Sequence, residues 1–299
     1  MTTSARGAQV DAPSVTLSTR LGRRRRRGLY AVTIYTVLII LTIIFTAPII
    51  WMVLASFQTT GQIVQVPAHW IVWPPTFENY PSVATAVPLL RYVGNSLFLS
   101  VSNVIGVLFS SSLVAYSFSR LRWPGRDIVF GVMVATVLLP STVTLIPVYL
   151  IWRNLHLTNT YWPLIVPSFF GNPFYIFLLR QFMLGIPQEY ADAARIDGAS
   201  EARIMTSIVV PLAIPALTAI SVFTFINTWE DFFLPLIYLD DPNRLTMALA
   251  LQQFVGSHVQ DWGPLMAGVV IFILPILFLF VVAQRFILEG VTFSGSSVG

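Results

Sequence analysis

Long apolar runs alternate with short polar connections along most of this chain. Six windows are long enough to cross a hydrocarbon core of about 30 Å, which needs roughly 20 helical residues. They run from about 29 to 54, 96 to 119, 128 to 151, 161 to 183, 208 to 226 and 264 to 286. The pattern predicts an all-α polytopic membrane protein with six transmembrane helices.

The windows also predict how the chain is organised. The first apolar run is far longer than the roughly 7 to 15 residues of a signal peptide, so we interpret it as a retained helix. The loop after it alternates Trp with Pro, which suits either a partner surface or an aromatic belt at the membrane interface. We expect a basic disordered cytoplasmic tail over 1–28, a first transmembrane helix over 29–56, an extracytoplasmic loop over 57–90, a five-helix domain over 91–286 and a cytoplasmic tail over 287–299.

Composition excludes several classes of protein. Of the 299 residues, 56% are hydrophobic and 10% are charged, against about 25% charged in an average soluble domain. There is no Cys, so disulfides, thiolate nucleophiles and Cys-ligated metal centres are excluded. All 17 basic residues are Arg, and without Lys the chain has neither a Walker-type ATP site nor a Schiff-base mechanism. If ATP drives this protein, another chain must bind it.

The arginines predict the orientation. With a cytoplasmic N-terminus, 14 Arg fall on inner segments and three, Arg91, Arg153 and Arg244, on outer loops. This is a strong positive-inside bias, and it predicts that both termini are cytoplasmic. The five-arginine run at 23–27 directly precedes an apolar stretch, so it indicates orientation at the membrane rather than nucleic-acid binding.

Catalytic and metal sites are not expected. His69, His156 and His258 fall on separate outer loops, and ordinary solvated histidines are the better reading than a shared metal site. No His, Asp and Glu constellation lies on one side at useful spacing.

The inner loop at 186–203 concentrates the charges. Asp192 and Arg195 are spaced i,i+3, Gly198 can supply a left-handed residue that ends a helix, and Ser200 can cap the next one. We expect two short helices around a sharp turn. Because alanines leave little bulk on the first helix, it could enter a cleft on a partner, or it could be an amphipathic connection with a solvated face.

Polar residues within the helices are candidates for a pathway. Asn172 stands between Gly171 and Pro173, where the backbone should kink toward a cavity or a neighbouring helix. At the outer end of the fifth window, Asn227, Glu230 and Asp231 either line an external vestibule or mark the interface.

The stretch Glu189-Tyr190-Ala191-Asp192-Ala193-Ala194-Arg195-Ile196-Asp197-Gly198-Ala199 resembles the EAA loop of ABC importer permeases, and Pro211 and Pro215 follow where that family has paired prolines. Further segments are similar to the carbohydrate-uptake branch, of the maltose, trehalose or glycerol-phosphate type. They include residues 95–97, 119–126, 139–140, 146–147, 177–182 and 284–286. The similarity extends from about residue 30 to the C-terminus.

The resemblance implies the type I ABC importer fold and a bacterial inner-membrane location. It implies a heterodimer with a second permease, a cytoplasmic ATPase dimer that binds ATP and Mg, and an extracytoplasmic solute-binding protein or lipoprotein, with no cofactor in this chain. Asp192 stands where the family usually has Glu, which keeps the charge but shortens its reach to the ATPase. The residues implied to couple to the ATPase are Glu189, Asp192, Ala193, Ala194, Arg195, Asp197, Gly198 and Ala199.

We therefore expect a permease subunit for a sugar or sugar derivative. The alternatives are an importer permease for another polar solute, such as a polyamine or phosphonate, and a secondary transporter. The last should have inverted internal repeats and ion-coupling carboxylates within the membrane, and the sequence has no convincing repeat.

Overall fold

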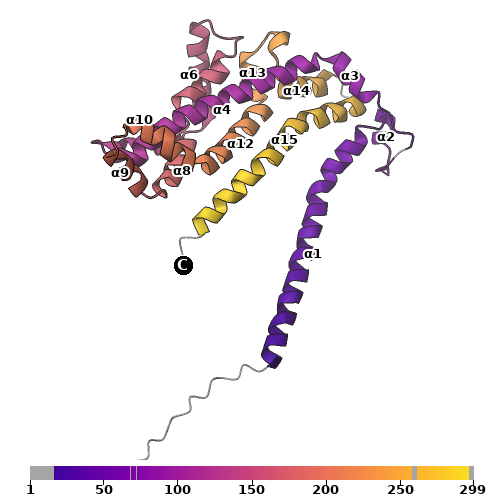
Figure 1. Ribbon diagram of the computed structural model, residues 1–299. Helices are drawn as coiled ribbons and strands as arrows, with labels where there is room; N and C mark the ends of the chain where they lie inside the picture. Colours follow the sequence, from indigo (N-terminus) through magenta and orange to yellow (C-terminus); the bar gives the residue numbers. More distant parts are fainter. Residues whose placement is uncertain (1–16, 68, 72, 258–260, 296–299) are drawn as a thin grey trace, which may run out of the picture. The chain divides into compact units, whose positions relative to one another are not determined.

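The computed structural model of the protein describes residues 17–67, 69–71, 73–257 and 261–295. It divides into two compact units, Met1–Leu54 and Ala55–Gly299. The described residues form helices joined by turns and loops, and they contain no β-strand (Figure 1). Residues 1–16 of the predicted tail and His258 lie outside the described residues.

One helix, α1 (Leu17–Ala55), makes up the described part of the first unit. Its apolar stretch Tyr30–Ala55 is 26 residues long, enough to cross a hydrocarbon core. The helix begins at Leu17, so residues 17–28 are helical. The prediction of a disordered tail is wrong for these residues. Arginine is a good helix former, and an arginine run can therefore extend an apolar helix toward its N-terminus.

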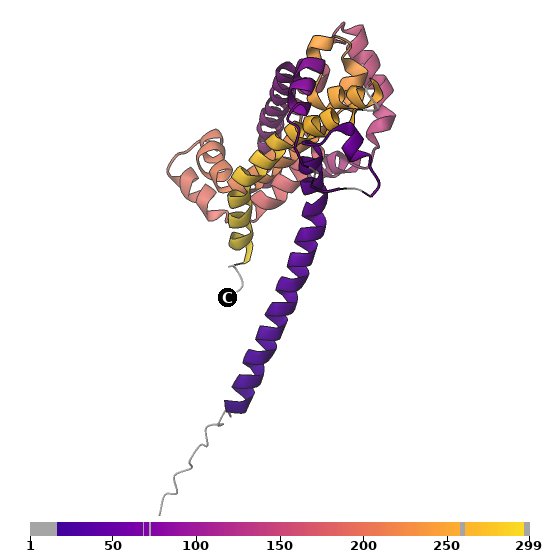
Figure 2. The ribbon, with the colours of Figure 1, turned by 90° about the vertical axis from the view of Figure 1, so that its right-hand side faces the viewer.

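The second unit is built around one long helix, α4 (Leu89–Arg120), which contacts α8, α12 and the 3₁₀ segment η1 (Figures 1 and 2). In chain order its helices are α2 (Thr60–Ile63), α3 (Asn79–Ala86), α4, α5 (Arg126–Thr136), α6 (Ser141–Asn154), α7 (Trp162–Ile165), η1 (Val166–Phe170), α8 (Pro173–Leu184), α9 (Glu189–Ile196), α10 (Glu201–Ile204), the π-helical turn η2 (Met205–Val209), α11 (Val210–Leu212), α12 (Ile214–Glu230), α13 (Phe233–Tyr238), η3 (Pro242–Arg244), α14 (Met247–Ser257) and α15 (Trp262–Gly295).

Four described helical stretches are long and apolar enough to cross a membrane: Tyr30–Ala55, Leu89–Arg120, Trp162–Leu184 and Trp262–Gln284. The pair Glu201–Leu212 and Ile214–Glu230, bent by 76°, makes a fifth if it counts as one span. The six predicted windows are therefore not six continuous helices. At the C-terminal end, α15 continues to Gly295, into the segment predicted as a tail.

The third predicted window contains no helix long enough to cross a membrane. It is split between α5, which ends at Thr136, and α6, which begins at Ser141. Pro140 between them is extended, with φ −60° and ψ 131°. Proline lacks the amide hydrogen that a continuous helix needs, and it disfavours helical backbone at the residue before it. The helix is therefore broken at Pro140, and neither half is long enough to span a membrane alone.

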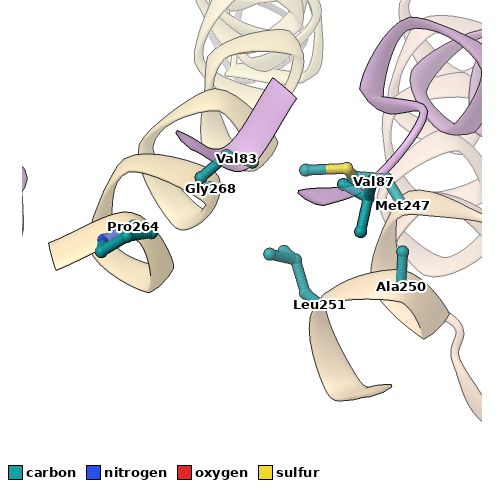
Figure 3. Close-up of a pocket in the computed structure, with 7 residues that line it drawn as sticks. All are labelled: Val83, Val87, Met247, Ala250, Leu251, Pro264 and Gly268. Atoms are coloured by element: carbon teal, nitrogen blue, oxygen red, sulfur yellow. The ribbon is translucent and has the colours of Figure 1, made fainter. Parts of the chain in front are cut away.

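Two clusters of buried apolar side chains form the core of the second unit. The larger joins α4, α8 and the segment after α9 through residues such as Tyr116, Leu179, Met183 and Ile204. The smaller surrounds Tyr92 and Met247 at the other end of α4. Near it, Val83, Val87, Met247, Ala250, Leu251, Pro264 and Gly268 line an apolar cavity of about 10 Å³ (Figure 3). That volume holds at most about one water molecule, so the cavity is a packing gap rather than a ligand site.

Close approach between α4 and η1 depends on a small residue. A Cβ atom built on Gly106 would meet Ser168 and lie 2.8 Å from Cδ2 of Phe169. One turn further on, the Ser110 hydroxyl donates to the carbonyl oxygen of Ser168 at 2.9 Å. Small residues at such crossings let membrane helices pack backbone to backbone.

We expect Gly106→Ala to destabilise the protein by about 1–3 kcal/mol, because the added methyl overpacks the crossing with η1. Gly94→Ala is the matched control on the same helix, since a Cβ there meets nothing within 4 Å. It should be neutral or stabilise by about 0.5–1 kcal/mol through better helix propensity. Thermal unfolding of both variants in one detergent tests this, and equal shifts for the two would contradict it.

Candidate coupling loop and polar helix breaks

The predicted pair of short helices around a turn is present as α9 and α10, at the same end of the second unit as the C-terminus of α4 (Figure 1). Glu189 and Asp192 lie in the first turn of α9 and Arg195 lies in its last turn, which suits the helix dipole. Gly198 has φ +79°, and the Ser200 hydroxyl accepts from the amide of Arg203 at 3.4 Å. The helix end at Gly198 and the cap at Ser200 are therefore confirmed.

Arg195 links the two short helices through two carboxylates. Its Nη1 lies 2.7 Å from Asp192 Oδ1, and its Nε lies 2.7 Å from Glu201 Oε1. The hydrogen bonds and charge of Glu201, followed by those of Asp192, raise the pKa of Arg195 above its ordinary value. Asp192 thus has a partner within its own helix, one turn away.

The two faces of α9 differ sharply. Ala191 is buried against the core, and Ala194 is partly buried beside it. Elsewhere on the helix, Tyr190 is 55% exposed and Ile196 is 87% exposed. These two side chains give α9 an apolar part on its exposed surface. Ala191 and Ala194 therefore face the rest of this chain, whereas Ala193, Tyr190 and Ile196 are exposed.

The base of the loop is held by an arginine for which the sequence predicted an inner location and a family resemblance, but no contact. Arg120, the last residue of α4, is 8% exposed and donates through Nη2 to the carbonyl oxygens of Met183 at 2.6 Å and Ile186 at 2.7 Å. Its Nη1 donates to Gln188 Oε1 at 2.5 Å. An arginine at the end of an apolar window is usual on topological grounds alone, so nothing local in the sequence distinguished it.

Asn172 caps a helix. Its side-chain oxygen accepts from the amides of Phe174 at 3.0 Å and Tyr175 at 3.3 Å, at the start of α8. Gly171 before it has φ +90°, where only glycine fits easily. Asn172 therefore satisfies, within its own helix, the backbone amides that the break in the fourth window leaves free.

The three outer candidates have separate surroundings. Asn227 donates to the Tyr175 hydroxyl at 3.3 Å, and Asp231 Oδ1 accepts from the amides of Phe233 at 2.9 Å and Leu234 at 3.2 Å. Asp231 thus caps α13. Glu230 is exposed and has no hydrogen-bond or ion-pair partner within the described part of the chain. Of the adjacent carboxylates, only Glu230 is left without a local structural role.

Residues 102–292 match the family model described as the inner membrane component of binding-protein-dependent transport systems. The chain belongs to this family. It is therefore an ABC importer permease, a translocation subunit and not an enzyme. The match includes the whole α9–α10 loop.

Relatives among characterised proteins extend over most of the chain. The diacetylchitobiose uptake system permease protein of Streptomyces coelicolor is 30% identical over 270 residues, 88% of each chain. The arabinooligosaccharide transport system permease protein of Halalkalibacterium halodurans is 31% identical over 251 residues, covering 83% of this permease and 90% of that protein.

A solved structure has the same fold. It is a bacterial ABC transporter involved in the import of the acidic polysaccharide alginate, with a TM-score of 0.74 and 23% identity. The match covers 92% of this permease and 99% of that chain. A second structure of an alginate transporter, in complex with a periplasmic protein that carries an alginate pentasaccharide, matches with a TM-score of 0.58.

We expect Asn172→Ala to destabilise this permease by about 1 kcal/mol, because it removes the cap of α8. Asn172→Asp should retain most of the stability, since a carboxylate oxygen can accept the same amide hydrogens. Thermal unfolding in detergent distinguishes the two variants. A stable Asn172→Ala variant with weakened solute uptake would instead assign this side chain to the pathway.

Proposed function

We propose that this permease forms half of the translocation pathway of an ATP-driven importer for a sugar or sugar derivative. Its loop at 186–203 couples it to a separate ATPase dimer, a second permease supplies the other half, and a solute-binding protein delivers the substrate from outside. The observation that carries the coupling role is the structure of α9, in which Ala191 and Ala194 meet the core while Tyr190 and Ile196 are exposed.

The sugar class is supported by the named relatives, which are uptake permeases for diacetylchitobiose and arabinooligosaccharides. A polyamine, the competing substrate, is a cation and would need free carboxylates such as those of the adjacent Glu230 and Asp231. Asp231 accepts two backbone hydrogen bonds at the start of α13, so the pair offers a cation one free carboxylate. We assign Glu230 and Asn227 to the outer vestibule, where Glu230 has no other partner within the described chain.

We further propose six crossings with both termini in the cytoplasm, in the inner membrane of a bacterium. Support comes from the fourteen-to-three arginine distribution. In this topology α5 and α6 together make the third crossing, and the segment from Glu201 to Glu230 makes the fifth with its bend at Ala213.

A native pull-down tests the assembly. The tagged permease, purified in mild detergent from its own host, should carry a second permease and an ATPase identifiable by mass. The associated binding protein should then bind diacetylchitobiose or an arabinooligosaccharide in calorimetry. Binding of spermidine instead would overturn the sugar assignment, and recovery of a chain that transports without any ATPase would overturn the assembly.

We expect Gly198→Val to uncouple ATP hydrolysis from uptake or to prevent ATPase assembly. A β-branched residue at φ +79° is strained by about 1–3 kcal/mol, so the turn after α9 should rearrange. Gly125→Val is the matched control, because Gly125 has φ +83° and equally open surroundings outside the loop. It should carry the same strain and retain its ATPase. Normal uptake and normal ATPase co-purification in Gly198→Val would contradict the coupling role.

A further inference from the structure

The coupling loop is attached to the core by a tyrosine hydroxyl. Tyr116 lies on α4 and is 4% exposed, within the cluster that includes Leu179 and Ile204. Its hydroxyl lies 2.5 Å from Oε2 of Glu201, the first residue of α10. A buried aromatic ring has little freedom, so this hydroxyl is a fixed point to which the loop is tied.

Glu201 connects the Tyr116 hydroxyl to α9. One carboxylate oxygen, Oε1, accepts from Arg195 Nε at 2.7 Å, and the other, Oε2, accepts from both Arg195 Nη2 at 3.3 Å and Tyr116. Arg195 in turn holds Asp192. A continuous chain of hydrogen bonds therefore runs from the core through α10 to the first half of α9.

Without the tyrosine this chain would be weak. The side chains of Arg195, Asp192 and Glu201 are 32%, 56% and 44% exposed, and ion pairs with such exposure contribute about 0–1 kcal/mol. The hydrogen bond to Tyr116 is the one link in the chain with a buried donor. This hydrogen bond therefore determines whether the ion-paired side chains are held in a fixed position relative to the core.

Tyr116 and Arg120 are spaced i,i+4, so they lie on one face of α4. Arg120 holds the segment before α9, through Ile186 and Gln188, and Tyr116 holds the segment after it, through Glu201. One face at the end of α4 thus forms hydrogen bonds to the segments on either side of α9 in the sequence.

We propose that Tyr116 is a positioning residue that transmits movement of the coupling loop to α4. A displacement of α9 on ATPase closure pulls on Glu201 through Arg195, and Glu201 moves the end of α4 through the Tyr116 hydroxyl. This inference rests on the proposed role of the loop. It adds a specific route into the transmembrane helices.

Hydrogen exchange of the native complex in nanodiscs tests the route. The complex of this permease with its co-purified ATPase is compared without nucleotide and with ATP, Mg and vanadate. In the unmodified protein, exchange should change both in residues 189–203 and in residues 113–121. In Tyr116→Phe the response at 189–203 should remain. The response at 113–121 should fall by about tenfold, the factor expected for one lost hydrogen bond to a charged group.

Tyr92→Phe is the matched control. Tyr92 lies on the same helix, is 5% exposed, and its hydroxyl has no hydrogen-bond partner in the described structure. Its response at 113–121 should equal that of the unmodified protein. Glu201→Ala should reproduce the loss in Tyr116→Phe, and the double variant should lose no more, because both changes break the same link.

The outcomes separate the two proposals. If residues 189–203 of the unmodified protein do not respond to ATP and vanadate, the coupling role of the loop is wrong. If they respond, and Tyr116→Phe still changes normally at 113–121, the loop couples by another route and the role of Tyr116 is wrong. Loss of the ATPase from purified Tyr116→Phe would also overturn the proposal, because the tyrosine would then be needed for assembly rather than transmission.

Discussion

A buried guanidinium at the end of α4 is the constraint on which the rest of this region depends. Arg120 has no carboxylate partner within the described residues. Its Nη2 donates instead to the carbonyls of Met183 and Ile186 and its Nη1 to Gln188, while its buried Nε has no hydrogen-bond partner in the described structure. Those carbonyls lie at the C-terminus of α8, where the helix dipole is negative. Because burying a charge costs several kcal/mol unless it is hydrogen bonded, the ends of α4 and α8 must stay in register.

A second arginine makes the same connection in the opposite direction. Arg180 of α8 donates to the carbonyl oxygen of Phe118 on α4 at 3.2 Å, and its guanidinium lies 4.1 Å from the centre of the Phe130 ring on α5. Each of the two helices, α4 and α8, thus has an arginine that donates hydrogen bonds to backbone carbonyl oxygens at the end of the other. The coupling loop starts directly after this contact between α4 and α8, so the position of its first residues is fixed by these two helices.

Breaks in the helices explain why polar residues were hard to interpret from the sequence. A helix interrupted in a membrane exposes amides that water cannot reach, and each must find a partner in the protein. Asn172 and Asp231 fill that need at the starts of α8 and α13. The same residue types, beside glycine, proline and aromatics, would also suit a solute pathway, and composition does not separate the two uses.

The sequence predicted what depends on neighbours along the chain. The helix from Glu189, the left-handed Gly198 and the cap at Ser200 are all local, and all are confirmed. Of the six apolar windows, at most five correspond to described helices long enough to cross a membrane. Arg120 with Ile186 and Tyr116 with Glu201 are 66 and 85 residues apart, and no periodicity links them. The third window did not form the predicted continuous helix, because mean hydropathy takes no account of the amide hydrogen that Pro140 lacks.

The bend of 76° before α12 determines the direction in which a movement of the coupling loop would displace α12. Where two helical segments meet at nearly a right angle, a displacement along the axis of the shorter segment is directed mainly across the axis of the longer one. The short arm, Glu201–Leu212, begins at the residue that Tyr116 and Arg195 share. Movement of Glu201 along the short arm would therefore displace α12 mainly across its own axis, which changes its spacing from neighbouring helices.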